Sequence, residues 1–540
     1  MAAGVAAATT TASANFIQTA RANQLKQASE LKKRYDYIVC GAGSSGCVVA
    51  RRLAENPNVS VLLLEAGPND DVPSVQVPIQ WITNLGTARD WGFKAEPSEY
   101  VNGRSIALNM GKTYGGGSSV NVMIWSRGHK NDWDYFAKEA GDDKWNYKSV
   151  LDIYKRIEDW TGEPDPARRG KGGMVHVEPC QKPNPVAPAF LKAAASVGIP
   201  TFADQNSKMM EGTGGAAIAN VRIKDGKRVS VFRTYVYPFL DRPNLTVLPE
   251  TLVTRLLLDG NRAQGVEIEN KGSTFKVEAT KEVILSMGAM NTPKVLMQSG
   301  IGDQAELKKF NIPVVQHLPG VGQNFQDHFM AGGCLWEYNT PQPPENQAAE
   351  ATFFWKSDPS LDTPDLQPFQ IEVPFASQEN LTRFKAPSTS WSLPPAVVRP
   401  HSRGEIKLSG PKPSDPIKIY ANYLKDERDM KAILKCVEIC RDIGNSAALK
   451  PFVKREVMPG NLKGKDLEKF VRDGVLTYWH QTCTAKMGRD NMSVVDGNLS
   501  VYGIKNLRIA DGSIMPRVTT GNTMAPCVVI GERMAEILRA

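Results

Sequence analysis

The sequence has no apolar run long enough to cross a membrane, no C-x-x-C pair and no block of like charges. The first absence excludes a helical membrane span, which needs about 20 consecutive apolar residues. The eight cysteines are dispersed, so we expect no disulfide framework, no metal site and a reducing, cytoplasmic location. The net charge is +8, but the basic residues are scattered, which argues against nucleic-acid binding.

The 540 residues have the composition of a folded protein, with 41% hydrophobic and 23% charged residues. This length allows more than one domain. Residues 1–34 are rich in Ala and Thr and then basic, and they lack the apolar core of a secretory signal. We predict a solvated helix from Asn15 to Lys33, and a remnant of a targeting peptide is the alternative.

A glycine-rich turn lies between two apolar runs near the N-terminus. Its spacing is that of a dinucleotide-binding βαβ unit, in which Gly41 permits a tight turn, Gly43 lets a diphosphate approach the backbone and Gly46 lets helix and strand pack closely. Free N–H groups at the helix N-terminus then face the phosphates. Glu65 follows about 20 residues later, where a carboxylate accepts hydrogen bonds from ribose hydroxyls. This unit alone fits NAD and FAD equally.

Two longer blocks supplement this turn. The first, from Gly111 to Asp134, contains three consecutive glycines followed by two serines. Bare backbone donors and small hydroxyls suit a planar or anionic group that must come close. Together with the second block, from Gly288 to Gly302, it resembles the two signatures of the glucose–methanol–choline (GMC) flavoprotein oxidoreductases, with a departure at Tyr114. The resemblance extends from about Tyr35 to the C-terminus.

The residue pattern also predicts local structure outside the first turn. The second block is typical of a strand from Glu282 to Ser286 and a helix that starts near Pro293, which makes it a second turn of the same sheet. Alternating apolar residues predict strands near 365–373 and 404–408, and an amphipathic helix is predicted from about Asp426 to Ile443.

The resemblance implies an α/β fold, α+β overall, in which a Rossmann-like FAD-binding domain is joined to a substrate-binding domain with an antiparallel sheet and helices. Because the second block returns to the first sheet, the FAD-binding domain is expected to be discontinuous. The predicted parts are an N-terminal extension at 1–34, an FAD-binding domain at 35–150, 231–330 and 476–540, and a substrate-binding domain at 151–230 and 331–475.

The resemblance also implies which residues contact FAD. For Val253, which matches a backbone contact to adenine, an ordinary edge-strand valine is an equal alternative. A subset of the family attaches FAD through a histidine beside the glycine–serine block, and Val120 stands there, so we predict non-covalent FAD. The predicted contacts are Gly41, Gly43, Ser44, Ser45, Gly46, Glu65, Ala66, Gly111, Gly116, Gly117, Ser118, Asn121, Val122, Met123, Val253, Trp479, Asp511, Gly512, Asn522 and Thr523.

The C-terminal 60 residues resemble the catalytic end of the family, where a histidine and a second histidine or asparagine face the flavin. The matching residues are His480 and Asn522. Oxidation of an alcohol removes a proton from oxygen and a hydride from carbon; His480 supplies the base and flavin the hydride acceptor. The Asn522 amide can hold the substrate oxygen. We predict a structural role for His328, which matches a segment that packs by the cofactor.

The expected reaction is oxidation of a primary, aryl or otherwise apolar alcohol to the aldehyde, with oxygen or a quinone-type compound as electron acceptor. The aromatic residues Trp125, Trp355, Phe353, Phe354, Phe369 and Phe375 hint at an aromatic cavity, although such residues more often build a core. Hydroxynitrile lyases, photodecarboxylases and a non-catalytic flavin-binding protein are the alternatives. The sequence does not determine the oligomeric state.

Overall fold

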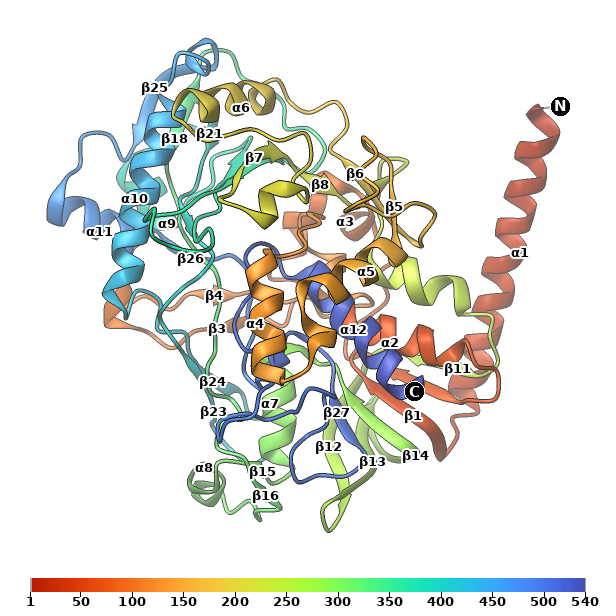
Figure 1. The fold of residues 1–540 in the computed structure, drawn as a ribbon. Helices are drawn as coiled ribbons and strands as arrows, with labels where there is room; N and C mark the ends of the chain where they lie inside the picture. Colours follow the sequence, from red (N-terminus) through yellow and green to blue (C-terminus); the bar gives the residue numbers. More distant parts are fainter. Residues whose placement is uncertain (1, 540) are drawn as a thin grey trace.

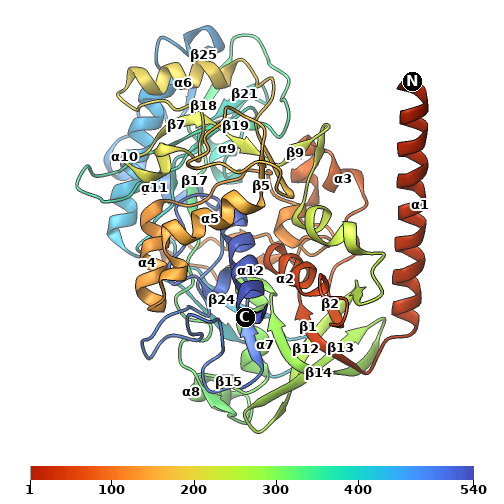
Figure 2. The same ribbon diagram turned by 45° about the vertical axis from the view of Figure 1, so that its right-hand side comes forward.

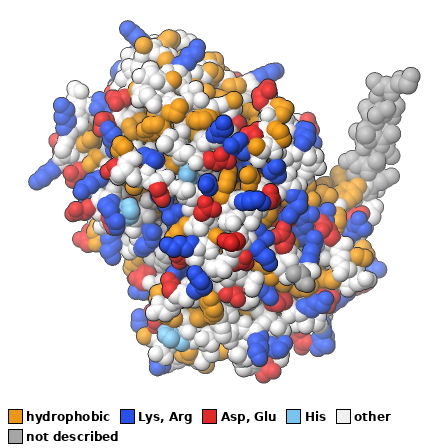
Figure 3. All heavy atoms as spheres, in the orientation of Figure 1, with side chains coloured by type: hydrophobic (Ala, Val, Ile, Leu, Met, Phe, Trp, Pro, Cys, Tyr) orange, Lys and Arg blue, Asp and Glu red, His pale blue; other side chains and the backbone are white. Residues whose placement is uncertain are grey.

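The computed structural model describes residues 2–539, with side chains from residue 16 onward. Two sheet-containing layers are visible in Figure 1, one below and one above, with helices packed on both. On the face drawn in Figure 3, acidic and basic side chains are interspersed rather than gathered by sign. No helix among residues 2–539 combines the length and apolar character that crossing a bilayer requires.

The lower layer is a seven-stranded sheet in the order β11-β2-β1-β14-β13-β12, with β27 also paired to β14. The pairs among β11, β2, β1, β14 and β27 are parallel, whereas β14, β13 and β12 form an antiparallel meander. The central strands are buried, as both faces of a parallel sheet usually are. The bounds are β1 Arg34–Cys40, β2 Val61–Leu64, β11 Leu245–Leu248, β12 Thr251–Asp259, β13 Arg262–Asn270, β14 Ser273–Leu285 and β27 Leu507–Ile509. This sheet and its helices confirm the α/β prediction.

The upper layer is a six-stranded antiparallel sheet in the order β25-β18-β21-β20-β19-β7. Helices α6 and α10 lie beside it in Figure 1. The apolar side of α10 is buried, as its amphipathic pattern predicts, and Asp426 accepts a hydrogen bond at its N-terminus. The bounds are β7 Gly215–Ile218, β18 Leu335–Tyr338, β19 Ala349–Phe354, β20 Phe369–Ile371, β21 Ser390–Ser392, β25 Val453–Met458, α6 Val186–Ser196 and α10 Glu427–Gly444.

The remaining helices and strands are short and lie outside the two large sheets, apart from β20. The predicted strand near 365–373 is limited to β20, and that near 404–408 pairs as a hairpin. Their bounds are α3 Pro73–Gln76, α4 Lys130–Ala140, α5 Tyr147–Ile157, α8 Gln304–Lys309, α9 Gln378–Arg383, α11 Gly464–Gly474, β3 Phe93–Lys94, β4 Ala107–Leu108, β5 Glu158–Trp160, β6 Val175–Pro179, β8 Asn220–Val221, β9 Ile223–Lys224, β10 Lys227–Arg228, β15 Ile301–Gly302, β16 Gln316–His317, β17 Phe329–Ala331, β22 Ala396–Val397, β23 Glu405–Leu408, β24 Ile417–Tyr420 and β26 Val475–Thr477.

Two turns of the lower sheet lead into buried helices. The first joins β1 to α2 (Ser44–Ala54), which packs against the C-terminal helix α12 (Met524–Arg539). The second joins β14 to α7 (Gly288–Gln298), so this helix begins five residues before the predicted start and Pro293 lies inside it. A proline cannot donate to the carbonyl four residues earlier. The Thr484 hydroxyl donates to that carbonyl, of Ala289, instead, at 2.7 Å.

The helix α1 (Ala2–Ser29) projects from the molecule and meets it through its C-terminal part (Figure 2). It starts earlier and ends earlier than the predicted helix at 15–33. The Gln24 amide pairs with the edge strand β11 as another strand would: Nε2 donates to the Leu245 carbonyl at 3.0 Å, and Oε1 accepts from the Val247 N–H at 2.9 Å. The Asn23 and Gln27 amides both donate to the Arg242 carbonyl. The described end of α1 therefore covers the edge of the main sheet.

Candidate active site

A cavity of about 630 Å³ lies at the carboxyl ends of the parallel strands and extends under the six-stranded sheet. In open α/β sheets this end of the strands is the usual ligand site. Of the predicted contacts, Gly46 and Met123 do not line the cavity. The predicted residues that do are Gly41, Gly43, Ser44, Ser45, Glu65, Ala66, Gly111, Gly116, Gly117, Ser118, Asn121, Val122, Val253, Trp479, His480, Asp511, Gly512, Asn522 and Thr523.

The three positions of the first turn are occupied by glycine for different reasons. Gly41 has a φ of +102°, and a Cβ there would overlap the Ser286 carbonyl. A Cβ on Gly46 would overlap the Gly41 carbonyl, so this glycine serves helix packing. A Cβ on Gly43 would lie 3.8 Å from the nearest protein atom, and the residue faces the cavity. Protein packing therefore does not require a glycine at 43, whereas a closely approaching ligand does.

The glycine–serine block completes this cradle. Gly116, with a φ of +51°, packs on the Gly43 backbone. Gly117 faces the cavity, and no atom lies within 4 Å of the position that its Cβ would take. Together, Gly43 and Gly117 leave backbone open on two sides of one space, which fits the diphosphate of a dinucleotide.

Two buried carboxylates organise the turns around this space. Glu65 accepts from the backbone N–H groups of Ala42 at 3.0 Å and Gly67 at 2.9 Å, and burial raises its pKa to about 7. Asp511 accepts from the Gly288 N–H at 2.9 Å and from the Thr292 hydroxyl at 2.6 Å. The contacts of Asp511 explain why α7 begins at Gly288, since a side chain from a distant segment satisfies its first N–H group.

His480 and Asn522 meet at the other end of the cavity. Asn522 Nδ2 lies 3.3 Å from His480 Nε2, and Asn522 Oδ1 accepts from Gln367 Nε2 at 3.2 Å. Because the amide oxygen is already bonded to Gln367, its NH₂ group faces the imidazole. With the amide in this orientation, His480 Nε2 carries a lone pair and can take up a proton.

The other ring nitrogen of His480 faces His328. The two Nδ1 atoms are 2.9 Å apart, and one proton is shared between them. Since Nε2 of His480 accepts, its proton sits on Nδ1 and is donated to His328. The sequence predicted a structural role for His328, and in the structure its ring contacts the imidazole of His480 and holds that ring in one tautomer. Sequence reasoning missed Gln367 altogether.

Burial controls the ionisation of this cluster. It lowers the pKa of His480 to about 3, so the imidazole is neutral at physiological pH. Burial and the neighbouring His480 lower the pKa of His328 as well. Asp327 accepts from the His480 backbone N–H at 2.8 Å and from the hydroxyls of Tyr423 and Thr477, and burial raises its pKa to about 6. This carboxyl fixes the backbone at His480 and makes no hydrogen bond to the imidazole.

Aromatic side chains form the wall beside His480. Trp479 has a φ of +61°, an uncommon conformation for a bulky residue, and Thr477 accepts its N–H at 2.8 Å. In this conformation the Trp479 ring packs against two others: its centroid lies 6.0 Å from that of Trp81 and 6.2 Å from that of Phe375. Of the six aromatics that hinted at the cavity, Phe369 and Phe375 line it. The other four, which do not, are Trp125, Phe353, Phe354 and Trp355.

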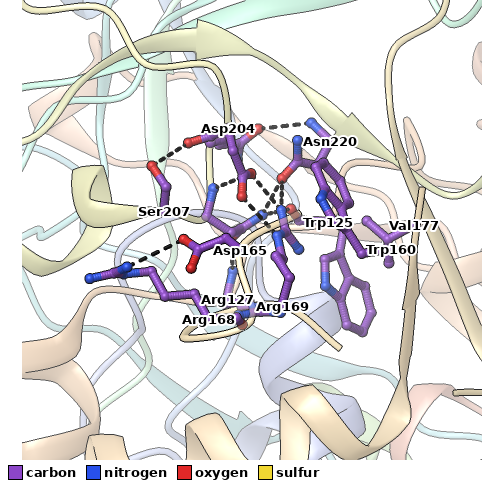
Figure 4. A network of polar contacts seen from close by, with 12 residues as sticks. Trp125, Arg127, Trp160, Asp165, Arg168, Arg169, Val177, Asp204, Ser207 and Asn220 are labelled. Carbon is purple, nitrogen blue, oxygen red and sulfur yellow. Dashed lines mark hydrogen bonds and ion pairs between the residues drawn. The ribbon is translucent and has the colours of Figure 1, made fainter. Parts of the chain in front are cut away.

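A buried ionic network holds the chain that follows the glycine–serine block. Glu158 accepts from Trp125 Nε1 at 2.6 Å, from Arg127 Nε at 2.7 Å and from Arg169 Nη1 at 3.0 Å. Figure 4 shows Arg169 reaching on to Asp204. Burial opposes the charge on Glu158, but the two guanidiniums bring its pKa below the usual value. Two arginines face two acids here, so the buried charges balance.

Comparisons with known proteins identify relatives of this chain and of its fold. Two family models, both described as GMC oxidoreductase, match residues 35–330 and 400–531. Mitochondrial choline dehydrogenase of Mus musculus is 35% identical over 551 residues, covering 95% of this chain and 90% of the relative. An alcohol dehydrogenase [acceptor] of Pseudomonas putida is 35% identical over 534 residues, covering 93% and 95%. Pyridoxine 4-oxidase from Mesorbium loti superposes with a TM-score of 0.89 at 31% identity, covering 93% and 98%.

Proposed function

Since this chain belongs to the GMC oxidoreductase family, and is therefore a flavoprotein oxidoreductase that acts on alcohols, we propose that it oxidises a primary alcohol with an aryl or apolar substituent to the aldehyde. The observation that carries the proposal is the pairing of His480 Nε2 with the Asn522 amide at an aromatic end of the cavity. A non-catalytic flavin protein has no need for a base and an oxygen-binding amide beside an apolar wall.

The polarity of the cavity supports a neutral substrate. Among the described residues that line it, the acidic ones are Glu65, Asp90 and Asp511. Each is already bonded to protein donors; Asp90, for example, accepts from the N–H groups of Gly86, Gly92 and Met110. No lining carboxylate among them is left to pair with a cationic alcohol. The aromatic wall alone offers a cation–π site, so a quaternary ammonium alcohol is the second candidate.

The residues divide the chemistry between them. His480 Nε2 removes the hydroxyl proton, and the Nδ1 proton held by His328 keeps Nε2 free for it. Asn522 Nδ2 holds the substrate oxygen beside the base. FAD, when bound, supplies the acceptor for the hydride that leaves the carbon. After the aldehyde has formed, His480 carries the proton that it removed. Because burial disfavours the protonated imidazole, His480 gives this proton up to solvent once the aldehyde has left, which restores the neutral base.

A screen of alcohols tests the substrate class. Benzyl alcohol, hexanol and choline are mixed anaerobically with the protein, and flavin bleaching is followed, with oxygen-electrode and dye-reduction measurements alongside. We expect bleaching by benzyl alcohol and hexanol. Bleaching by choline alone would replace the proposal with the cationic alternative, and no bleaching by any alcohol would reject alcohol oxidation. The paired measurements separate oxygen from quinone-type acceptors.

The domain division proposed from the sequence accords with the strand arrangement. We infer an FAD-binding domain at 35–150, 231–330 and 476–540 and a substrate-binding domain at 151–230 and 331–475. The seven-stranded sheet is built from strands of all three segments of the first domain. Five of the six strands of the upper sheet, with their bounds above, fall in 331–475 and β7 falls in 151–230.

The pH dependence follows from the burial of His480. Because its pKa is lowered to about 3 from 6.5, lowering the pH to about 5 leaves the base unprotonated. We therefore expect kcat/KM for an uncharged alcohol to be flat from about pH 5 to 8. Initial rates in overlapping buffers measure this, with recovery of full activity on return to pH 7 as the control. Because Asp327 holds the His480 backbone and burial raises its pKa to about 6, the Asp327→Asn variant is measured alongside. An acidic limb near 6.5 that persists in this variant would show that His480 is solvated in the free enzyme.

We also infer that FAD is held non-covalently. Val120 lines the cavity where a subset of the family has the histidine that bonds to flavin, and a valine side chain cannot form that bond. Acid precipitation is expected to release FAD into the supernatant, where its absorbance is compared with that of the whole sample. Yellow colour retained in the washed, unfolded pellet would contradict this inference.

A further inference from the structure

Two buried arginines lie behind the glycine–serine block without an acidic partner. Arg228 is 5% exposed and Arg222 is 1% exposed. Arg222 Nη2 donates to the Thr234 hydroxyl at 2.5 Å, whereas its Nε and Nη1 have no partner. Arg228 Nη2 is also buried and unpartnered. Unsatisfied N–H groups on buried cations are costly, so they call for an explanation.

Neither charge is offset by the described part of the chain. Burial lowers the pKa of Arg228 to about 9 and that of Arg222 to about 10, and no carboxylate among the described side chains counters either effect. Arg222 itself lowers the pKa of Arg228, since the two charges repel. Both guanidiniums nevertheless stay charged near neutral pH. Two positive charges are thus buried together without a counter-charge.

This is not how the chain treats its other buried arginines. Arg127 and Arg169 pair with Glu158, and Arg169 also pairs with Asp204. Figure 4 shows Arg169 beside Asp204. The buried Arg533 pairs with Glu536, and the half-buried Arg233 pairs with Asp70 at 2.7 Å. Each of these arginines pairs with a carboxylate. Arg222 and Arg228 differ from them, because neither pairs with a carboxylate among the described side chains.

The place of Arg228 indicates what the pair faces. Its Nη1 donates to Asn121 Oδ1 at 2.8 Å and to the Ser118 carbonyl at 3.3 Å, and both of these residues line the cavity. Its Nε donates to the Val75 carbonyl at 2.7 Å, which fixes the guanidinium. The charge lies one residue layer behind the Gly116–Asn121 turn, whose other side is the open backbone at Gly117.

We propose that Arg228, assisted by Arg222, provides the counter-charge for the diphosphate of FAD from behind the Gly116–Asn121 turn. A diphosphate ester carries two negative charges at neutral pH, which match the two buried positive charges in number and sign. In a water-excluded interior such attraction is far stronger than at a surface. The inference rests on FAD binding but not on the alcohol substrate, so its failure is distinguishable from failure of the proposed reaction.

The proposal predicts effects of opposite sign in the two forms of the protein. Without FAD, the two buried positive charges destabilise the fold, and replacing one of them with an apolar residue of similar shape removes its desolvation cost. With FAD, the same replacement removes an attraction. Arg228→Met is therefore expected to leave the melting temperature of the apo-protein unchanged or higher, while the Kd for FAD rises at least about tenfold.

The experiment compares apo-protein and FAD-loaded protein for each variant, by thermal melting and by fluorescence titration with FAD. The matched control is Arg169→Met, which breaks a balanced pair and should lower the melting temperature of both forms equally. Arg228→Lys, which keeps the charge, should restore most of the affinity. A fall in melting temperature of both Arg228→Met forms, with an unchanged Kd, would show a scaffold role and overturn the proposal.

A second titration identifies the anion. ADP, which carries the diphosphate but no flavin, should lose affinity for Arg228→Met by about the same factor as FAD, and riboflavin should lose none. An unchanged Kd for ADP with a lowered flavin midpoint potential would instead place the charge at the reduced ring and reject the proposal. If Arg228→Met does not fold, the measurements are made on Arg222→Met, and an unchanged Kd for FAD there also rejects it.

Discussion

Replacing His480 with alanine is expected to lower kcat by about two to four decades, the range for loss of a positioned general base. The backbone N–H of residue 480 donates to Asp327, and alanine keeps this contact. The backbone that lines the cavity should therefore stay in place, and the cofactor should stay bound. Removal of the ring leaves the buried Nδ1 of His328 without its 2.9 Å partner, so a loss of about 1–3 kcal/mol in stability is also expected. Stopped-flow flavin reduction measures the chemical step directly.

A matched control is available for this variant. His129 is also buried but lies outside the cavity, where its ring accepts from the Asn131 N–H and contacts the Gly212 carbonyl. His129→Gln should therefore affect stability and leave kcat near normal. Near-normal turnover of His480→Ala with a full complement of flavin would remove His480 from the catalytic role.

Replacing Gly43 with valine is expected to raise the Kd for FAD about 10- to 100-fold while the apo-protein still folds. The φ of −75° and ψ of −167° at Gly43 are accessible to valine, and protein atoms leave room for its Cβ. The added side chain would occupy the space between Gly43 and Gly117. Fluorescence titration of apo-protein gives the Kd, and circular dichroism confirms the fold.

The neighbouring glycines give the comparison for this prediction. Gly41→Ala introduces a Cβ at positive φ against the Ser286 carbonyl, and Gly46→Ala introduces one against the Gly41 carbonyl. Both variants should reduce the yield of folded protein even without FAD. If Gly43→Val bound FAD as tightly as the unmodified protein, the space beside Gly43 would not be the diphosphate site.

Local sequence predicted the first turn well because each of its requirements is local. Gly41 and Gly46 are constrained by atoms within the same βαβ unit or the adjoining strand end, so their spacing carries the geometry. The predicted start of α7 was wrong by five residues for the opposite reason. Asp511 and Thr484, about 200 residues away, supply the hydrogen bonds that let the helix begin before Pro293.

The residues of the candidate site also fall into those that local sequence identified and those that it did not. His480 and Asn522 lie in a recognisable C-terminal pattern, so the sequence could place them. Gln367 and His328 belong to other segments and reach this pair only through the fold, since Gln367 contacts the Asn522 amide and His328 the His480 imidazole. Spacing cannot reveal such contacts. The sequence hinted at Phe369 and Phe375 in the aromatic wall but missed Trp81, which comes from a short helical segment far from Trp479 in sequence.

The contact between α1 and β11 limits how the N-terminus can be processed. A peptidase that cut between residue 2 and residue 22 would spare Asn23, Gln24 and Gln27, which hold the helix to the strand. A cut at the end of the predicted extension, after residue 34, would remove all three and leave β11 with unpaired backbone groups. Such an edge is a template for another chain. We therefore expect a chain that begins at residue 35 to self-associate through the exposed edge of β11.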